Sequence, residues 1–420
     1  MTKKNLNSDK NDLNTPQQTH PHPQAKKALS ILTAVNYLNY IDRFILSAVL
    51  LSIKVDLNLS DFQAGLLATA FMVAYMFTSP LFGWLGDTKK RTWLLAGGAL
   101  LWSLASLMTG WAGTFVLLAL SRFILGFGES AFTTIATPYI SDFYPSTRRG
   151  RALAIFSSGL PVGAALGFVM GGLLGQYFGW RNAFFIVGFP GIILSALILT
   201  LPEPKTKTTL LDFNYTKILK EISRIPPYFW TTLGYCAYTF VVGGVAHWVP
   251  TYLQRTYALD QMKANTLFGG IAVGSGLIGT LLGGYLGDKW SAQSGKGGHL
   301  KLSALSMALS LPFFIGTLYA PNIGALIFFL SLTQLFFFLS TSPVTVSIIE
   351  SVPAKAQTTA VAITIFLCHI LGDAISSPLI GLISDNTGSL KLGMSICIPM
   401  IFVSSFCWYL GMKSHRKISL

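Results

Sequence analysis

Two oppositely charged side chains, Asp42 and Arg43, are neighbours within the first long apolar stretch of the chain, residues 28–53. An ionised side chain at the centre of a bilayer costs about 2.5–3.5 kcal/mol, so adjacent charges there indicate a function. We expect a buried polar site inside a membrane protein. The alternative is a charge pair that only packs two helices together.

Other polar residues share a helical face with Arg43, because a helix turns by about 100° per residue. We expect this face to line a cavity, with Asp42 turned toward a second neighbouring helix. The polar residues on this face or beside it are Asn36, Asn39, Tyr40, Arg43 and Ser47.

A second charged group lies in the apolar stretch 113–140, where Arg122 and Glu129 are two turns apart on one helical face. Glu129 should lie near the depth of Asp42. Desolvation favours the neutral form of this carboxyl, whereas Arg43 or Arg122 favours the charged form, which is what a proton-coupling site requires. The alternative is a structural Glu–Arg pair that braces the first half, and the two roles can coexist.

His369 and Asp373 are four residues apart in another apolar stretch and therefore share a helical face. Such a pair could be a second proton site, could hold a substrate headgroup, or could be a hydrogen-bonded pair that packs helices. Gln334 could supply a neutral contact to a substrate. His247 is expected at the outer rim of its helix.

The composition places these charges in a membrane. Hydrophobic residues make up 52% of the 420 residues and charged residues 11%, and the mean hydropathy is +0.56. These values predict an integral membrane protein. Twelve apolar stretches are long enough to be transmembrane helices, at 28–53, 61–86, 92–110, 113–140, 151–177, 182–201, 227–254, 264–287, 300–320, 321–349, 358–383 and 389–412.

The basic residues predict the orientation. Of the 30 Lys and Arg, 23 lie in the two tails and in the loops on the same side as the tails. The positive-inside rule therefore predicts that both termini are cytoplasmic. The net charge of +14 does not indicate nucleic-acid binding, because no basic folded face with interleaved aromatic residues lies outside the membrane. Residues 1–27 are expected to be a disordered cytoplasmic tail and not a signal peptide.

The sequence also repeats. Gly83–Asp87 recurs as Gly284–Asp288, 201 residues later, and Ala152–Ile155 recurs as Ala360–Ile363, 208 residues later. The fold predicted is an all-α membrane protein of twelve transmembrane helices in two pseudo-symmetric six-helix bundles, with a substrate site between the halves. The predicted segments are bundles at 28–201 and 227–412, a cytoplasmic linker at 202–226 and a cytoplasmic tail at 413–420.

Other classes of chemistry have no sequence signature here. The chain has no Walker loop, no HExxH or GxSxG motif and no His/Cys cluster, which argues against an ATP-driven pump or a hydrolase. The four cysteines lie within apolar stretches without CxxC spacing, so we expect core thiols with no disulfide or metal. No enzymatic activity and no cofactor are predicted.

The motifs resemble those of the major facilitator superfamily. The loop from Gly83 to Arg91 is similar to the signature between the second and third spans, although Lys90 stands where Gly is usual. This resemblance implies a cytoplasmic gate made by charged residues of that loop, its repeat and the 143–151 loop. The implied gate residues are Asp87, Arg91, Arg148, Arg149 and Asp288.

Within the superfamily, three strings resemble the Spinster-type lipid transporters and their bacterial relatives: Asn39–Phe44, Gly126–Pro138 and Ile155–Gly163. The first string is shared with anion:cation symporters. The resemblance implies a proton-coupled transporter of an amphipathic lipid-like anion that works by alternating access, with a lysophospholipid as candidate. Arg43 would meet the headgroup, and Asp42 and Glu129 would exchange the proton.

Two other functions remain open. One is a proton-coupled importer of small organic anions such as sugar acids. The other is a non-transporting membrane receptor, but the predicted gate loops argue against a receptor. The predicted partners are the substrate, protons and membrane lipids. A monomer in the bacterial inner membrane is expected.

Overall fold

The computed structural model describes residues 21–203, 221–295, 297–353 and 356–418, and all of its regular elements are helices. Most of the predicted linker therefore lies outside the described residues. The helices before the linker are α1 (Ala25–Leu57), α2 (Asp61–Thr88), α3 (Arg91–Trp111), α4 (Phe115–Phe143), α5 (Ser146–Ser157), α6 (Gly159–Phe178) and α7 (Trp180–Ile198). Those after it are α9 (Pro226–Tyr257), α10 (Gln261–Ser294), α11 (Gly298–Leu318), α12 (Ile323–Leu339), α13 (Thr341–Glu350), α14 (Gln357–Cys368), the π-helix η3 (His369–Asp373), α15 (Ala374–Thr387), α16 (Leu390–Met394) and α17 (Cys397–Ile418).

Ten helical stretches among the described residues are long and apolar enough to cross a membrane. Two further helices, α1 with 33 residues and α9 with 32, are each the first of their half. A 33-residue helix is about 50 Å long, which exceeds the hydrocarbon thickness of about 30 Å. α1 is less apolar than the ten because it carries the polar residues of the predicted site. The twelve predicted spans are thus consistent with the structure.

Four predicted spans are interrupted helices, among them 389–412, which is α16 and α17. The stretch 151–177 is α5 and α6, which meet at Ser158, and 321–349 is α12 and α13, which meet at Ser340. In the fourth, the five residues of η3 separate α14 from α15. Such π-helical turns occur frequently at functional sites. The π-helix begins at His369 and ends at Asp373, the pair that the sequence singled out.

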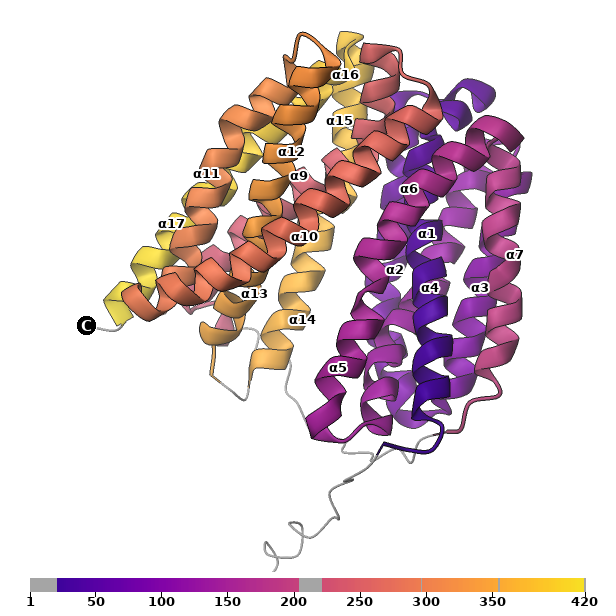
Figure 1. Cartoon of the computed structure of the whole chain (residues 1–420), viewed down its shortest axis with the longest axis horizontal. Helices are drawn as coiled ribbons and strands as arrows, with labels where there is room; N and C mark the ends of the chain where they lie inside the picture. The colour runs from indigo at the N-terminus through magenta and orange to yellow at the C-terminus, as the bar shows by residue number, and fades with distance from the viewer. Residues whose placement is uncertain (1–20, 204–220, 296, 354–355, 419–420) are drawn as a thin grey trace, which may run out of the picture.

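The helices form two sets that meet at one end of the molecule and separate toward the other (Figure 1). α1–α7 make one set and α9–α17 the other. Described residues 21–25, 143–151 and 199–203 lie at the separated end, the predicted cytoplasmic end. Between the two sets, the hydrogen bonds and ion pairs of the described residues all come from the opposite, predicted outer, halves of the helices.

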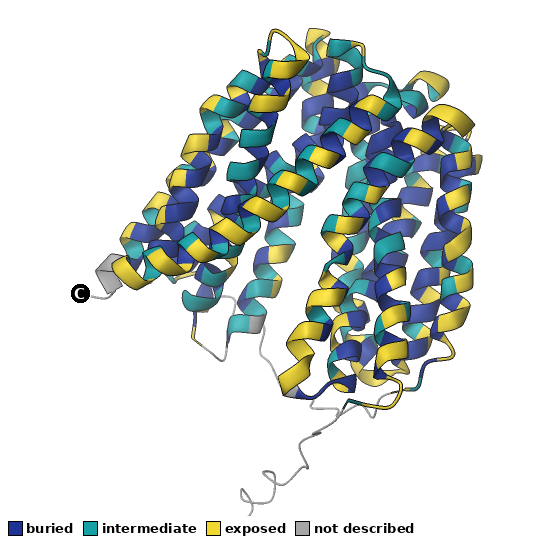
Figure 2. Cartoon of the chain, viewed as in Figure 1, coloured by how far each residue is buried: buried dark blue, intermediate teal, exposed yellow. Residues whose placement is uncertain are grey.

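Buried residues lie mainly where helices meet, and exposed residues cover the outside of both sets (Figure 2). Many exposed residues are large and apolar, including Trp93, Val116 and Leu281. An apolar outer surface suits contact with lipid. Glycines bring helices together near the predicted site: a Cβ on Gly126 would lie 2.3 Å from the Phe71 carbonyl oxygen, and one on Gly128 would lie 2.7 Å from the Trp102 amide. α2 and α3 therefore approach α4 closely at these two glycines.

Candidate functional site: a buried charge cluster between the helices

Arg43 and Glu129 form an ion pair between α1 and α4. The Arg43 Nη2 donates to Glu129 Oε2 at 2.7 Å, and its Nε donates to the same oxygen at 3.1 Å. The Arg43 side chain is 18% exposed, whereas that of Glu129 is fully buried. The arginine therefore lies at the boundary between the protein interior and accessible space. Of the two arginines that the sequence offered as partners for Glu129, Arg43 makes the direct contact.

Three aromatic rings surround the Arg43 guanidinium. Its Cζ lies 5.3 Å from the ring centre of Tyr40, 4.8 Å from that of Phe71 and 5.1 Å from that of Tyr75. Rings at these distances attract a cation through their quadrupoles and supply apolar surface beside it. The positive charge of Arg43 thus has apolar surface directly beside it.

Asp42 and Arg122 are two further buried side chains of opposite charge. They are too far apart to form a direct ion pair. Asp42 is buried and accepts a hydrogen bond of 2.5 Å from the Ser106 hydroxyl on α3, the second neighbour that helical geometry predicted. Arg122 is also buried, and its Nε and Nη1 have no hydrogen-bond partner. It lies within electrostatic range of both Asp42 and Glu129. When all four side chains are ionised, the cluster is electrically neutral, which limits the cost of its burial.

The other residues on the Arg43 face have separate partners. The Asn36 amide donates to the Phe156 carbonyl at 2.8 Å, where α5 ends. Asn36 and Tyr40 line a cavity of about 240 Å³ between α1, α4 and the α5–α6 junction. Asn39 is buried beside Glu129, and its amide atoms have no partner of ordinary hydrogen-bond geometry among the described residues. Ser47 contacts α9 and lies outside this cavity.

The His369–Asp373 pair lies in the second set of helices. The His369 Nδ1 is 3.0 Å from Asp373 Oδ2, and the His369 ring centre is 6.3 Å from that of Tyr75. Because Tyr75 also contacts Arg43, one ring joins the two predicted groups. Gln334 is buried on α12 and makes no hydrogen bond to these charged residues within the described chain. Its predicted role as a neutral contact therefore has no support from the contacts of this conformation.

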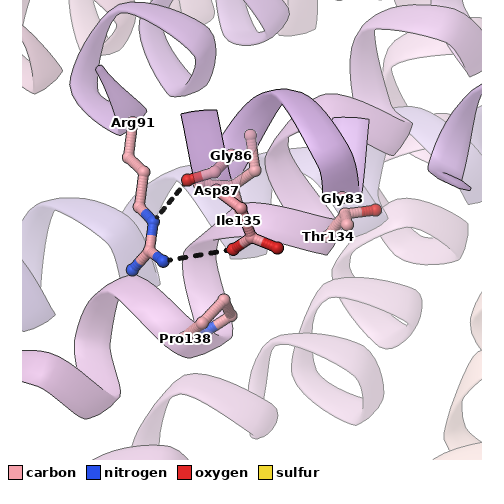
Figure 3. A pocket seen from close by; sticks show the side chains of 7 residues that line it. All are labelled: Gly83, Gly86, Asp87, Arg91, Thr134, Ile135 and Pro138. Atoms are coloured by element: carbon pink, nitrogen blue, oxygen red, sulfur yellow. Dashed lines mark hydrogen bonds and ion pairs between the residues drawn. The ribbon is translucent and has the colours of Figure 1, made fainter. Parts of the chain in front are cut away.

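The predicted gate loop has a defined geometry at the cytoplasmic end (Figure 3). The Arg91 guanidinium donates to the Gly86 carbonyl at 2.8 Å and to Asp142 at 2.7 Å. Asp87 is only 3.6 Å from the same guanidinium, and its side chain is 68% exposed. These residues belong to the first set of helices, and a cavity of about 210 Å³ lies between them and α4.

Glu203, which the sequence reading missed, supports this loop. Its carboxylate accepts hydrogen bonds from the backbone amides of Arg91 at 2.7 Å and Thr92 at 3.0 Å, the first residues of α3. Lys90, the residue before α3, supplies no side-chain cap. A carboxylate at a helix N-terminus satisfies free amides and the helix dipole. Glu203 thereby positions Arg91, the gate arginine.

The remaining predicted gate residues are not joined across the two sets. Arg148 and Arg149 are exposed on α5 and make no ion pair within the described residues. Asp288 is exposed, and its carboxylate lies 3.5 Å from the His299 ring on α11. Contacts that would close the cytoplasmic end are therefore absent from the described part of this conformation.

The outer end, in contrast, is closed by a network around Asp61. Both Asp61 carboxylate oxygens accept hydrogen bonds of 2.8 Å from Arg255 on α9, and one also accepts a bond of 2.7 Å from Ser384 on α15. Lys54 pairs with the same carboxylate. Asp385 in turn accepts from the backbone amides of Asp61 and Phe62, each at 2.8 Å. The sequence reading missed this network, because Asp61 after Ser60 is also typical of an ordinary helix N-terminus.

His247 corrects a prediction. It was expected at the outer rim, but only 5% of it is exposed, and its Nδ1 lies 3.4 Å from the Ser47 hydroxyl of the other set. The prediction is wrong because α1 and α2 of the other set cover this part of α9 in this conformation, with Ser47 and the backbone of Ala64 beside the ring.

The comparisons with known proteins agree with this fold. Residues 32–372 match the family model described as the Major Facilitator Superfamily. The chain therefore belongs to this superfamily of membrane transporters, and it is a transporter and not an enzyme.

Within the superfamily, the chain belongs to the Spinster family. It is 32% identical over 382 residues to protein spinster homolog 1 of Xenopus laevis, a match that covers 85% of this chain and 72% of that protein. It is 29% identical to the probable sphingolipid transporter spinster homolog 1 of Arabidopsis thaliana, covering 91% and 87%. The fold is similar to that of a bacterial homolog of the human lysosomal transporter Spinster in an inward-facing, occupied conformation, with a TM-score of 0.85, 20% identity and coverage of 95% and 99%.

Proposed function

We propose that this chain is a proton-coupled transporter of an amphipathic anion, with lysophospholipids as the substrate class, and that it works by alternating access. The observation that carries the proposal is the Arg43–Glu129 ion pair at the edge of accessible space. The two six-helix halves, 28–201 and 227–412, would move against each other. Both termini would be cytoplasmic in a bacterial inner membrane, and the monomer would be the working unit.

Alternating access is supported by the unequal ends of the molecule. At the outer end, Asp61 links α2 to α9 and α15 through hydrogen bonds of 2.7–2.8 Å. At the cytoplasmic end, the partners of Arg91, Asp87 and Asp288 among the described residues all belong to their own half. Such an arrangement is the one expected of an inward-open state. Movement to the outward-open state would break the Asp61 network and join the gate residues across the halves.

Proton coupling follows from competition for Arg43. The guanidinium donates two hydrogen bonds to one Glu129 oxygen, and an anionic headgroup would need the same donors. A proton on Glu129 removes the charge that holds the arginine and frees it for the anion. Proton binding and anion binding therefore favour each other and move together. Asp42, close to Arg122, is the second carboxylate in the proposed proton exchange.

The surroundings of Arg43 favour an amphipathic anion over a small polar one. Three aromatic rings adjoin the guanidinium, and the adjacent cavity is lined by Phe156 and Leu160 as well as by polar residues. A headgroup on Arg43 would thus have apolar surface beside it for a chain. His369 and Asp373, which reach the same region through Tyr75, are proposed to contact the headgroup from the second half.

The test is uptake by proteoliposomes. Labelled lysophospholipid inserts into bilayers unaided, so albumin extraction of the outer leaflet is needed to count only molecules that have crossed. We expect protein-dependent protection from albumin that increases with an imposed pH gradient, and no uptake of a labelled sugar acid. Gradient-driven uptake of the sugar acid with no movement of the lysolipid would reject the proposed substrate class and support the small-anion alternative.

A further inference from the structure

His247 occupies the layer that separates the charge cluster from the outer closure. It belongs to α9, yet its ring contacts the Ser47 hydroxyl on α1 and lies beside the backbone of Ala64 on α2. Ser47 is five residues beyond Asp42 toward the outer end, or about 7.5 Å along the helix. His247 is therefore a titratable group from one half that is enclosed by the other half in this conformation.

No anion compensates a charge on this ring. Its Nε2 has no hydrogen-bond partner in the described structure. The charged group that faces it most closely from α4 is Arg122, another cation. The acidic groups of the surrounding helices are engaged elsewhere: Asp42 with Ser106, Glu129 with Arg43, Asp61 with Arg255 and Lys54, and Asp373 with His369.

The cost of charging His247 therefore depends on conformation. In the present state, an imidazolium would be a buried, unpaired cation near Arg122, and such charges cost several kcal/mol. When the outer ends separate, the contact between Ser47 and His247 is lost, and water reaches the ring. An unperturbed imidazole has a pKa of about 6.5, and the outer face of a membrane can be exposed to solutions of that pH.

We propose that His247 is a proton-binding site that keeps the outer side open when it is charged and allows closure only when it is neutral. This inference rests on the alternating access proposed above. It does not require that the transported proton bind here, because Asp42 and Glu129 retain that role. It predicts that acid on the outer side favours the outward-open state even without substrate.

The experiment measures the distance between spin labels at Val116→Cys and Leu392→Cys, two exposed outer-end positions in different halves. The protein is held in lipid nanodiscs without substrate. Between pH 7.5 and pH 5.5, one imidazole that titrates only in the open state raises the open-to-closed ratio by about tenfold. His247→Gln should reduce this change to less than twofold. His247→Lys, which is charged at both pH values whenever water reaches the side chain, should show the long distance at both pH values.

The matched control is His299→Gln, because His299 is also buried but has its two acidic neighbours in its own half. This variant should keep the tenfold response. A tenfold response in His247→Gln, or a closed outer side in folded His247→Lys, would overturn the inference. If pH has no effect on the parent protein but lysophospholipid lengthens the distance, the inference on His247 fails alone. If neither lengthens it, alternating access fails as well.

Discussion

Replacing Glu129 by Gln distinguishes two roles for this residue: a proton carrier and a structural brace. Gln has the shape of the protonated carboxyl and carries no charge, so it mimics the state in which Arg43 is free for an anion. In the parent protein, an anion must displace the two hydrogen bonds of 3.1 and 2.7 Å that Arg43 donates to Glu129. A hydrogen bond to a charged group contributes about 1.5–3 kcal/mol.

The expected consequence is tighter binding. Releasing one such interaction corresponds to roughly a ten- to hundredfold increase in affinity, because each 1.4 kcal/mol is a factor of ten. The loss of stability should be moderate, since Arg43 is 18% exposed and retains three aromatic neighbours. A brace predicts the opposite: an unpaired buried cation that costs about 3–5 kcal/mol and no gain in affinity.

The assay is equilibrium binding of a fluorescent lysophospholipid at pH 8, with thermal unfolding measured on the same samples. Asp56→Asn is the matched control, because Asp56 pairs with Arg181 at the outer surface, away from the cluster. We expect tighter binding and a small decrease in Tm for Glu129→Gln, and no change in affinity for Asp56→Asn. Unchanged or weaker binding by a folded Glu129→Gln protein would refute the competition for Arg43.

Substitutions at four other residues test separate parts of the structure. Arg43→Ala should abolish transport while the protein still folds, and Arg43→Lys should rescue poorly because an ammonium lacks the planar fork; a parent rate of uptake by either would remove Arg43 from the headgroup site. Asp87→Asn should shift cysteine labelling toward the inward-open state by about 1–3 kcal/mol, since the exposed Asp87 loses little in the present conformation. Asp61→Asn should shift the same labelling outward, and identical shifts for both variants would contradict the two-gate arrangement. Glu203→Ala should lower stability by about 0.5–2 kcal/mol through loss of the α3 cap, measured by thermal unfolding against Glu221→Ala as a control.

The sequence predicted the helices and the existence of a charged site well, because both have local signals. Apolar stretches of about 20 residues must be helical in a bilayer, and a residue such as Asp42 is costly there unless it has a use. Helical spacing also predicted that Asp42 would face a different neighbour from Arg43, and the bond to Ser106 agrees.

Contacts between helices could not be predicted in the same way. Spacing placed Glu129 near both Arg43 and Arg122, but only the packing of α1 on α4 decides that Arg43 makes the ion pair. The π-helix at His369 depends on how the chain packs against α9, where Gly372 meets the Thr239 hydroxyl and the backbone of α9. Burial of His247 depends on how the two halves are placed relative to each other, and no local sequence pattern indicates that placement. Glu203 acts on Arg91 across 112 residues.

The most direct test of proton-coupled anion transport is proton movement that depends on the substrate. Proteoliposomes that contain a pH-sensitive dye receive lysophospholipid on the outside, with no imposed gradient. The competition at Arg43 predicts that the interior acidifies with the parent protein, because the anion and a proton enter together, and that it does not acidify with Glu129→Gln. Lysolipid entry without acidification, or acidification that persists in Glu129→Gln, would contradict the proposed coupling through Glu129.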